Sequence, residues 1–427
     1  MTVARLTRRL AGLLGRRLDE VRLDEVEDPR DPRGQRWELG TLLTAAVAGL
    51  AAGARSTAEV ERITERMPRA MRRWLKIPRR VPDTTLRDTL CCLEPEQVVG
   101  RLHAVVRAAH RRKALELDVL PFGVLSLDGK ATSIASCDDR YAQRQTGQDG
   151  APLVGLVRSV TATLVSSCAR PCIDVVSIPA HTNEMGAFRT ALAHVMQAYA
   201  GLDLFRLVAY DAGAASLDNA NAVLEQSLHY LFCLRSTQPT LYEAARQWLG
   251  TRSYDQADHV DVCHERGHIV TRQLFLGAAS DAPEGWQHLR TIIRIKTVIT
   301  DKQGRLVSAE DRYLMSSLAT DRLTPEQWQA LVRRRWGVEV THQVLDTAFA
   351  EDDHPWIEQD PRGLLVVAIL RRIAYTLLTL FRSVTQRSDD RRSVPWKHLL
   401  EAVYLMLLTV TAEQLRGLRR SHQAAPS

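Results

Sequence analysis

Apolar residues in the first part of the chain follow the spacing of an amphipathic helix. Between residues 36 and 50 they recur every three or four positions, at Leu39, Leu42, Leu43, Ala46 and Leu50. A second helix is predicted from Ser56 to Arg66, because Ser56-Thr57-Ala58-Glu59 has the form of a capping box. Further helices are predicted to begin at Asp83 and at Glu94-Pro95. We therefore expect a helical domain over residues 1–117.

At about residue 120 the pattern changes to short apolar runs that alternate with helical segments. Helices are predicted at 184–199 and 219–226, and strands at 124–127, 152–165, 172–178, 204–210 and 229–235. Three strands, a helix, a strand, a helix and a strand is the order of an RNase H-like core. We therefore predict an α/β fold in which residues 118–240 form the first part of this core.

Residues 251–316 are dense in β-branched side chains that alternate with polar ones, which predicts several further strands. Asp301-Lys302-Gln303-Gly304 fits a tight hairpin turn between two of them. Because this segment interrupts the alternation of strands and helices, we interpret residues 241–318 as a mostly β insertion into the core.

Helical periodicity returns after residue 324. Helices are expected at 326–345 and 362–382, and we assign residues 319–385 to the second part of the core. Residues 386–427 are predicted to form a C-terminal helix and a tail, with the helix at 397–415.

Three acidic residues stand where a metal-dependent nuclease would place them. Asp128 follows the apolar run 124–127, Asp211 follows 207–210, and Glu339 lies in a predicted helix. A carboxylate after a strand stands at the carboxyl edge of an open α/β sheet, where such sheets bind ligands. Pairs of divalent cations bound by carboxylates can break and rejoin phosphodiester bonds. We interpret the three acids as catalytic residues, although an Asp after a strand is also a common turn or cap residue.

The charge of the chain points to a polyanionic partner. Lys and Arg number 57 against 50 Asp and Glu, which gives a net charge of +7. Arginine predominates in the basic clusters, and its guanidinium suits bidentate contact with phosphate. The clusters include Arg72-Arg73, Arg79-Arg80, Arg111-Arg112-Lys113 and Arg333-Arg334-Arg335. The excess is moderate and supports a polyanionic partner, while solvated helix faces remain the simpler explanation of any single pair.

Cysteine usage and hydropathy bear on the compartment. The seven cysteines form no Cys-x-x-Cys pair, which fits reduced thiols. Cys263-His264 with His268 lacks a second cysteine pair at finger spacing, so ordinary strand residues are expected there rather than a zinc site. No apolar run is expected to span a bilayer, and the basic N-terminus lacks a secretory cleavage pattern. We expect a cytoplasmic protein without a membrane partner.

The motifs around the three acids resemble those of bacterial insertion-sequence transposases of the DDE type, in the H-repeat-associated group. Leu127-Asp128-Gly129-Lys130, Asp211-Ala212 and Trp336-Gly337-Val338-Glu339 are similar to the three catalytic motifs of that family. Thr182-Asn183-Glu184 resembles its Ser-Asn-Glu, and Thr237-Gln238-Pro239 resembles its Asn-Gln-Pro segment. The resemblance runs over most of the chain, from about residue 28 to residue 382, and includes a helical domain ahead of the catalytic core.

This resemblance implies a metal-dependent DNA transposase with an RNase H-like catalytic core. Asp128, Asp211 and Glu339 would bind two Mg²⁺ or Mn²⁺ per active site, cleave DNA at the transposon ends and join the 3′-hydroxyl to target DNA. The helical domain and basic surfaces would hold the terminal inverted repeats of double-stranded DNA. The protein would act as a homodimer on DNA and would be associated with the nucleoid. Candidate DNA contacts are Lys130, Asn183, Gln238, Arg334, Arg335, Trp336 and His342.

Several of these assignments have structural alternatives. Arg335 could hold a phosphate or form an ion pair within the protein, Trp336 could stack on a base or pack in the core, and His342 could be a buried structural residue. The sequence also departs from the family after the third acid, where Val340 replaces the usual Asn. Two other functions therefore stay open: a catalytically inactive or recruited transposase-derived DNA-binding protein, and an RNase H-fold nuclease without strand transfer.

Overall fold

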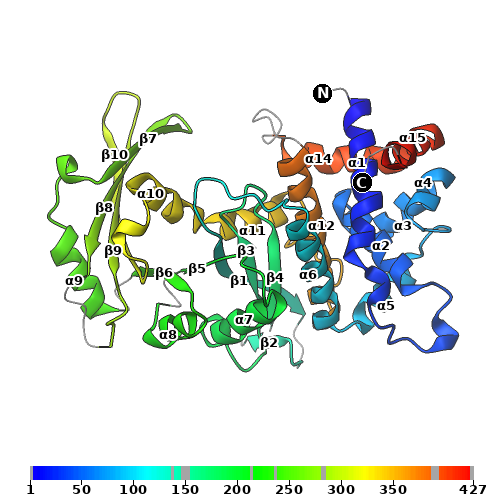
Figure 1. The fold of residues 1–427 in the computed structure, drawn as a ribbon. Coiled ribbons are helices and arrows are strands. Elements are labelled where there is room, and N and C mark those ends of the chain that lie inside the picture. Colours follow the sequence, from blue (N-terminus) through cyan, green and yellow to red (C-terminus); the bar gives the residue numbers. More distant parts are fainter. Residues whose placement is uncertain are drawn as a thin grey trace.

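The chain folds into a helical bundle joined to a long mixed sheet with helices on both faces (Figure 1). A computed structural model describes residues 3–135, 139–145, 154–211, 215–234, 238–279, 285–385 and 394–423. The bundle lies at one end of the molecule, the core of the sheet in the middle and the outer strands of the sheet at the other end.

The helical bundle contains helices from both ends of the chain. Its N-terminal helices are α1 (Val3–Val21), α2 (Leu39–Ala51), α3 (Thr57–Arg66), α4 (Arg69–Trp74), α5 (Asp83–Cys92) and α6 (Pro95–Arg111). Helices α14 (Trp396–Thr409) and α15 (Ala412–Gln423) pack against α1. The predicted start of α3 is confirmed, since the Ser56 side chain accepts a hydrogen bond from the Glu59 amide.

Two features of the bundle differ from the predictions. Helix α1 was not expected, although Leu10, Leu14 and Val21 are fully buried at helical spacing; its many arginines obscured that pattern. The helix predicted at 397–415 is divided between α14 and α15. The break comes at Thr411, where Thr411 and Gln414 exchange side-chain to backbone hydrogen bonds and so start a new helix.

The sheet has ten strands in the described part of the chain. The first six are β1 (Val124–Ala135), β2 (Ala142–Gln145), β3 (Val154–Leu164), β4 (Cys172–Ser177), β5 (Leu207–Tyr210) and β6 (His229–Leu234). Strands β1, β5 and β6 are parallel, whereas β3 is antiparallel to β1. These strands follow one another in the order β2-β3-β1-β5-β6, with β4 also paired to β3. This mixed α/β architecture confirms the predicted fold class.

The β-rich segment after β6 continues the same sheet. It contains β7 (His259–Glu265), β8 (His268–Ala278), β9 (Thr291–Thr300) and β10 (Leu306–Ser316), and β10 is antiparallel to β6. The predicted turn before β10 is confirmed: the Asp301 amide donates to the carbonyl of Arg305 over 3.0 Å, and Gly304 has a φ of 80°. The insertion therefore lengthens the sheet at one side.

Helices cover both faces of the sheet (Figure 1). On one face lie α7 (Glu184–Ala198), α8 (Leu217–Glu225) and α9 (Pro239–Leu249), of which α9 was not predicted. On the other lie α10 (Pro325–Arg334) and α11 (Gly337–Thr347). Successive side chains of a strand point to opposite faces. Accordingly, Val208 and Tyr210 of β5 pack with α7 and α8, whereas Leu207 and Ala209 pack with α10.

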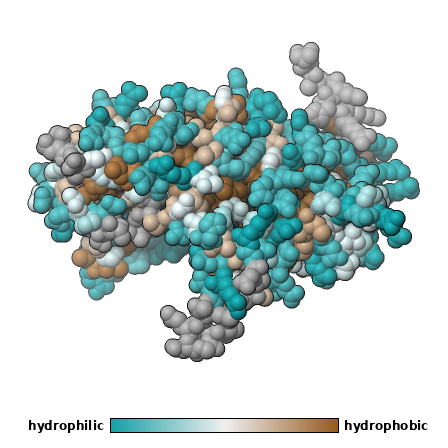
Figure 2. Space-filling model, turned by 90° about the horizontal axis from the view of Figure 1, so that it is seen from below, coloured by the Kyte–Doolittle hydropathy of each residue, from teal (hydrophilic) through white to brown (hydrophobic). Residues whose placement is uncertain are grey.

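Helix α12 (Pro361–Thr385) connects the bundle to the sheet by packing against α2, α5, α6 and β4. By length and composition, Pro361–Ser383 could cross a membrane, so the prediction that no run reaches that length was wrong. The Arg371-Arg372 pair hid this run in the sequence. The apolar window is wholly buried inside the protein, and the surface seen from below is mostly hydrophilic with smaller apolar patches (Figure 2). Helix α12 is therefore a core helix of this fold.

Candidate active site

Asp128 and Asp211 lie on neighbouring parallel strands. Ser126 of β1 is opposite Ala209 of β5, so the two aspartates, each two residues further along, stand at the same level. Strand β5 ends at Tyr210, directly before Asp211. The prediction that Asp128 likewise follows the end of its strand was wrong, because β1 continues its ladder with β3 as far as Ala135. Both aspartates nevertheless stand at the carboxyl end of β5, an edge typical of ligand binding.

Glu339 lies in the first turn of α11, over β1 and β3. The helix predicted at 326–345 is divided here into α10 and α11, with Arg335 and Trp336 between them. Gly337 lets the start of α11 approach the sheet closely, since a Cβ at this position would lie 2.7 Å from a side-chain carbon of Val165. The third acid is thus brought to the sheet edge by a helix that depends on a glycine.

The three carboxylates influence one another. Burial raises the pKa of Glu339 to about 6, and the negative charges of Asp128 and Asp211 act in the same direction. The charges of Arg335 and Arg312 oppose this rise. Mutual repulsion of this kind is relieved by a bound cation, and the donors are all hard carboxylate oxygens. The residues present therefore fit Mg²⁺ or Mn²⁺.

Each aspartate has a basic partner. Nδ1 of His342 lies 3.0 Å from a carboxylate oxygen of Asp128, and Nη1 of Arg335 donates to Asp211 over 3.2 Å. The carbonyl of Arg335 also accepts a hydrogen bond of 2.8 Å from the Ser126 hydroxyl, which ties the end of α10 to β1. Of the two alternatives for Arg335, the ion pair is the one that the structure contains. Both basic side chains are buried.

Trp336 lies beside the acids and is 36% exposed, so it is not packed in a core. The guanidinium carbons of Arg312 and Arg335 lie 4.9 and 5.0 Å from the centre of its ring. An exposed aromatic ring between two cations can stack on a nucleobase while the guanidinium groups contact phosphate. This arrangement agrees with the prediction of a DNA contact, which stays a prediction.

Lys130 is held by acids of the protein rather than projecting into solvent. It forms ion pairs with Asp346 of α11, with Asp352 at 3.0 Å and with Glu351 at 3.7 Å. Glu351 is itself buried and paired with Arg372 of α12. The observed role of Lys130 is therefore to connect β1 with α11 and the segment that precedes α12.

The remaining candidates for DNA contact also have partners within the protein. The Asn183 side chain accepts a hydrogen bond from the Gly186 amide and caps α7. Gln238 donates to the carbonyl of Ala215 over 2.8 Å. Arg334 pairs with Asp118 at 2.5 Å. Their structural contacts are thus established, and their contacts with DNA stay predictions.

Glu184 was not predicted as a site residue, yet it contacts a chain neighbour of each aspartate. Its Oε1 accepts hydrogen bonds from the Gly129 amide at 3.1 Å and from the Tyr210 hydroxyl at 2.6 Å. Burial, and then the charge of Glu184, raise the pKa of Tyr210 far above its usual value, so the phenol remains a donor. Glu184 therefore links the residue after Asp128 to the residue before Asp211. The sequence signal that could have identified Glu184 is its position in Thr182-Asn183-Glu184, the segment that resembles the family's Ser-Asn-Glu.

Comparison with protein families agrees with this arrangement. The DDE_Tnp_1-associated family matches residues 21–104, which lie in the helical bundle. The Transposase DDE domain family matches residues 161–377, just over half of the chain, and this range contains Asp211 and Glu339. No curated protein is similar enough to the chain to count as a match. Transposases of this family bind DNA and generally use divalent metal ions. The chain belongs to the DDE transposases of insertion sequences.

Proposed function

We propose that this transposase cleaves DNA at the ends of its insertion sequence and joins the freed 3′-hydroxyl to target DNA, with Asp128, Asp211 and Glu339 as catalytic residues. The observation that carries this proposal is the meeting of three acids from three elements at one sheet edge, close enough for two of them to raise the pKa of the third. The sequence around each acid also resembles a catalytic motif of the family, in the family's order; Asp211 and Glu339 lie within the residues that match the family, and Asp128 precedes them.

The three acids would hold two Mg²⁺ or Mn²⁺ ions. When bound, such a pair supplies Lewis-acid stabilisation of the attacking and leaving oxygens of an in-line displacement. The protein's own contribution is to hold the carboxylates, through His342 for Asp128 and Arg335 for Asp211.

The DNA end would lie across the surface formed by Arg312 and Trp336, and a phosphate would approach the buried guanidinium of Arg335 beside the acids. Guanidinium groups bind phosphate oxygens in pairs, and an exposed indole provides a stacking surface for a base. Arg335 is already oriented by its ion pair with Asp211. It would therefore align a phosphate beside the acids without a large loss of side-chain entropy.

The helical bundle would bind the terminal inverted repeats. A cavity of about 610 Å³ on its surface is lined by a dense group of cations, namely Arg36, Arg69, Arg72, Arg73, Lys76 and Arg79. Such a group suits contacts with several phosphates. Two transposon ends must be brought together, so we expect a homodimer on DNA, in the cytoplasm and on the nucleoid.

Cleavage and joining by purified full-length protein test this proposal. With Mg²⁺, we expect nicking of a duplex that carries the DNA flanking the gene, and joining of a pre-cut 3′-hydroxyl end to a plasmid. Asp128→Ala should abolish both reactions, whereas Glu65→Ala, at an exposed acid of α3, should preserve them. Equal nicking by wild type and Asp128→Ala would leave only a DNA-binding function. Nicking without joining would favour a nuclease.

A further inference from the structure

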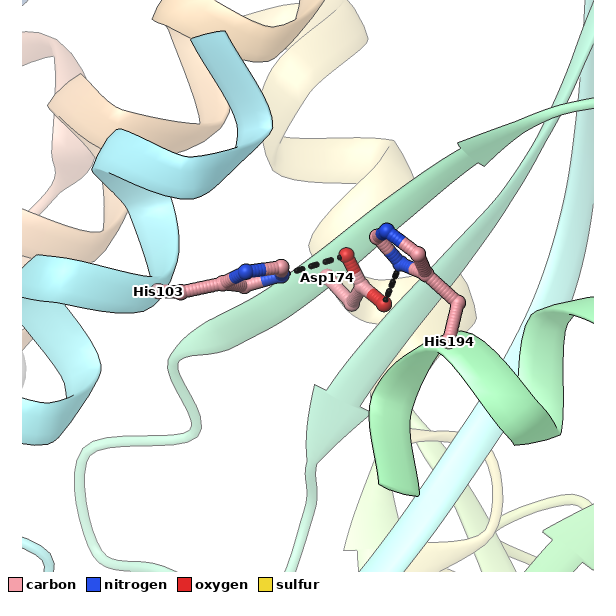
Figure 3. Close-up of side chains that lie close together, drawn as sticks. All are labelled: His103, Asp174 and His194. Carbon is pink, nitrogen blue, oxygen red and sulfur yellow. Dashed lines mark hydrogen bonds and ion pairs between the residues drawn. The ribbon is translucent and has the colours of Figure 1, made fainter. Parts of the chain in front are cut away.

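A second group of metal-binding side chains lies apart from the three acids. His103 of α6, Asp174 of β4 and His194 of α7 point toward one another (Figure 3). Nε2 of His103 lies 2.8 Å from one carboxylate oxygen of Asp174, and Nδ1 of His194 lies 2.7 Å from the other. One ligand atom from each residue lies within 4.8 Å of the other two, and no other such group occurs in the described part of the chain.

This cluster is not an extension of the catalytic site. Asp128 is paired with Thr161 across the β1–β3 ladder, whereas Ala162 is paired with Leu127 on one side and with Asp174 on the other. Paired residues share a face of the sheet, and successive residues alternate between faces. Asp174 therefore projects from the opposite face to Asp128. Asp174 faces α6 and α7, and Asp128 faces α11.

Asp174 lies in the interior of the protein, where its negative charge needs a compensating positive charge. Asp174 is completely buried and His103 is 8% exposed. The Val175 amide donates a further hydrogen bond of 2.9 Å to Asp174. Neutral imidazoles can donate hydrogen bonds to the carboxylate, but they leave its charge uncompensated in the interior. A divalent cation bound by both imidazoles and the carboxylate would supply that charge.

One side of the cluster is open. His194 borders a cavity of about 490 Å³, which is also lined by Glu96, Thr190 and His181. The side chain of His194 is 34% exposed, so an ion can enter from this side. Water in the cavity can then supply the fourth ligand of a tetrahedral zinc ion, in place of the fourth protein ligand that most structural zinc sites have.

We propose that His103, Asp174 and His194 bind one zinc ion that fastens the helical bundle to the sheet. Two imidazole nitrogens and one carboxylate oxygen favour zinc over magnesium, which prefers oxygen ligands. The ligands come from a helix of the bundle, a strand at the sheet edge and a helix that covers the sheet. This role is structural and does not depend on the proposed chemistry of the three acids.

Metal content of the full-length protein tests the zinc site. The measurement is made in the Asp128→Ala background, so that ions at the catalytic acids contribute less. We expect one zinc per chain by mass spectrometry after dialysis, and a rise in Tm when zinc is returned to chelator-treated protein. Asp128→Ala/His194→Ala should lose both. Asp128→Ala/His181→Ala is the matched control, since His181 borders the same cavity outside the cluster, and it should keep both.

Cobalt provides a second measurement that needs no new variant. Co²⁺ added to the chelator-treated Asp128→Ala protein should give the intense visible absorption of a tetrahedral site, and zinc should remove it. A protein without bound zinc, without a zinc-dependent Tm and without this absorption would overturn the proposal. The cluster would then be an ion pair between Asp174 and a protonated imidazole. If His194→Ala does not fold, judged by circular dichroism, the cobalt spectrum decides.

Discussion

Asp128 and Asp211 each have a basic partner of their own. His342 contacts Asp128 and Arg335 contacts Asp211, whereas Arg335 and Arg312 act on Glu339 through their charge. A buried partner fixes the rotamer of a metal-binding carboxylate and tunes its basicity. Changing such a partner should therefore weaken the binding of the ion without removing a ligand.

His342→Ala is the test at this scale. Loss of the contact with Asp128 should raise the Mg²⁺ concentration needed for half-maximal DNA cleavage by about 10–100-fold. The measurement is a Mg²⁺ titration of cleavage with the full-length protein. His354→Ala serves as the control, because this histidine is exposed and lies past the end of α11. An unchanged Mg²⁺ requirement in His342→Ala would mean that the contact does not support metal binding.

At the scale of elements, the sequence predicted best where both faces of a strand are covered. β6 was predicted at 229–235 and is observed at His229–Leu234, with residue 235 outside the described residues. Its side chains pack alternately with α7 and α8 on one face and with α10 on the other. β1 was predicted too short because its second half, from Asp128 onward, carries polar residues that pair with β3 while facing solvent in part. Strand pairing of this kind depends on a partner distant in sequence, which a local pattern does not contain.

The junction of α10 and α11 gives the prediction at this scale. A Cβ on residue 337 would lie 2.7 Å from Val165, so Gly337→Ala must push α11, and Glu339 with it, away from the sheet. We expect DNA cleavage to fall on the order of 100-fold and the free energy of unfolding to fall by about 1–3 kcal/mol. Cleavage assays and urea denaturation measure the two effects.

Gly100→Ala is the matched control for this substitution. Gly100 lies inside α6, and a Cβ added there would have no atom of another residue within 4 Å. Alanine at this position should therefore stabilise the helix by roughly 0.5–1 kcal/mol. If both variants cleaved DNA as wild type does, the close approach of α11 to the sheet would not matter for the position of Glu339.

At the scale of the whole molecule, the basic cavity of the bundle and the acids of the sheet lie in different parts of an elongated protein (Figure 1). A DNA end that reaches both would be gripped far from the point of cleavage. Substitutions at the basic cavity should therefore weaken DNA binding, whereas substitutions at the acids should weaken DNA cleavage.

Arg69→Ala/Arg73→Ala tests the grip, since both side chains are exposed at the cavity. Binding of the flanking DNA, followed by fluorescence anisotropy between about 50 and 200 mM salt, should weaken, and its salt dependence should fall by about two counterions. Arg266→Ala/Arg305→Ala removes two exposed arginines from the turns that connect the outer strands and should bind like wild type. Identical salt slopes for the two double variants would exclude the cavity as a phosphate site.

The fold class was predicted from the sequence and is confirmed, and the three acids were proposed from their motifs, but the sequence did not reveal what surrounds these acids. The motifs of residues 127–130 and 336–339 are local, and local patterns are visible in one sequence. Glu184 could not be placed, because it approaches Gly129 across 55 residues of chain. The cluster of His103, Asp174 and His194 was likewise invisible, since its members come from three elements that only the fold brings together.

The helical bundle contains helices from both ends of the chain, and this has a consequence for how the protein folds. Helices α1 and α2 complete their core with α12 and α14, which lie more than half the chain away in sequence. Contacts between residues so far apart in sequence form slowly, because a long loop must close before they stabilise the fold. During synthesis, the apolar faces of α1 and α2 therefore stay exposed to solvent until α12 and α14 have left the ribosome. Assembly of the helical bundle should accordingly be a late step of folding, and a step at which chaperones act.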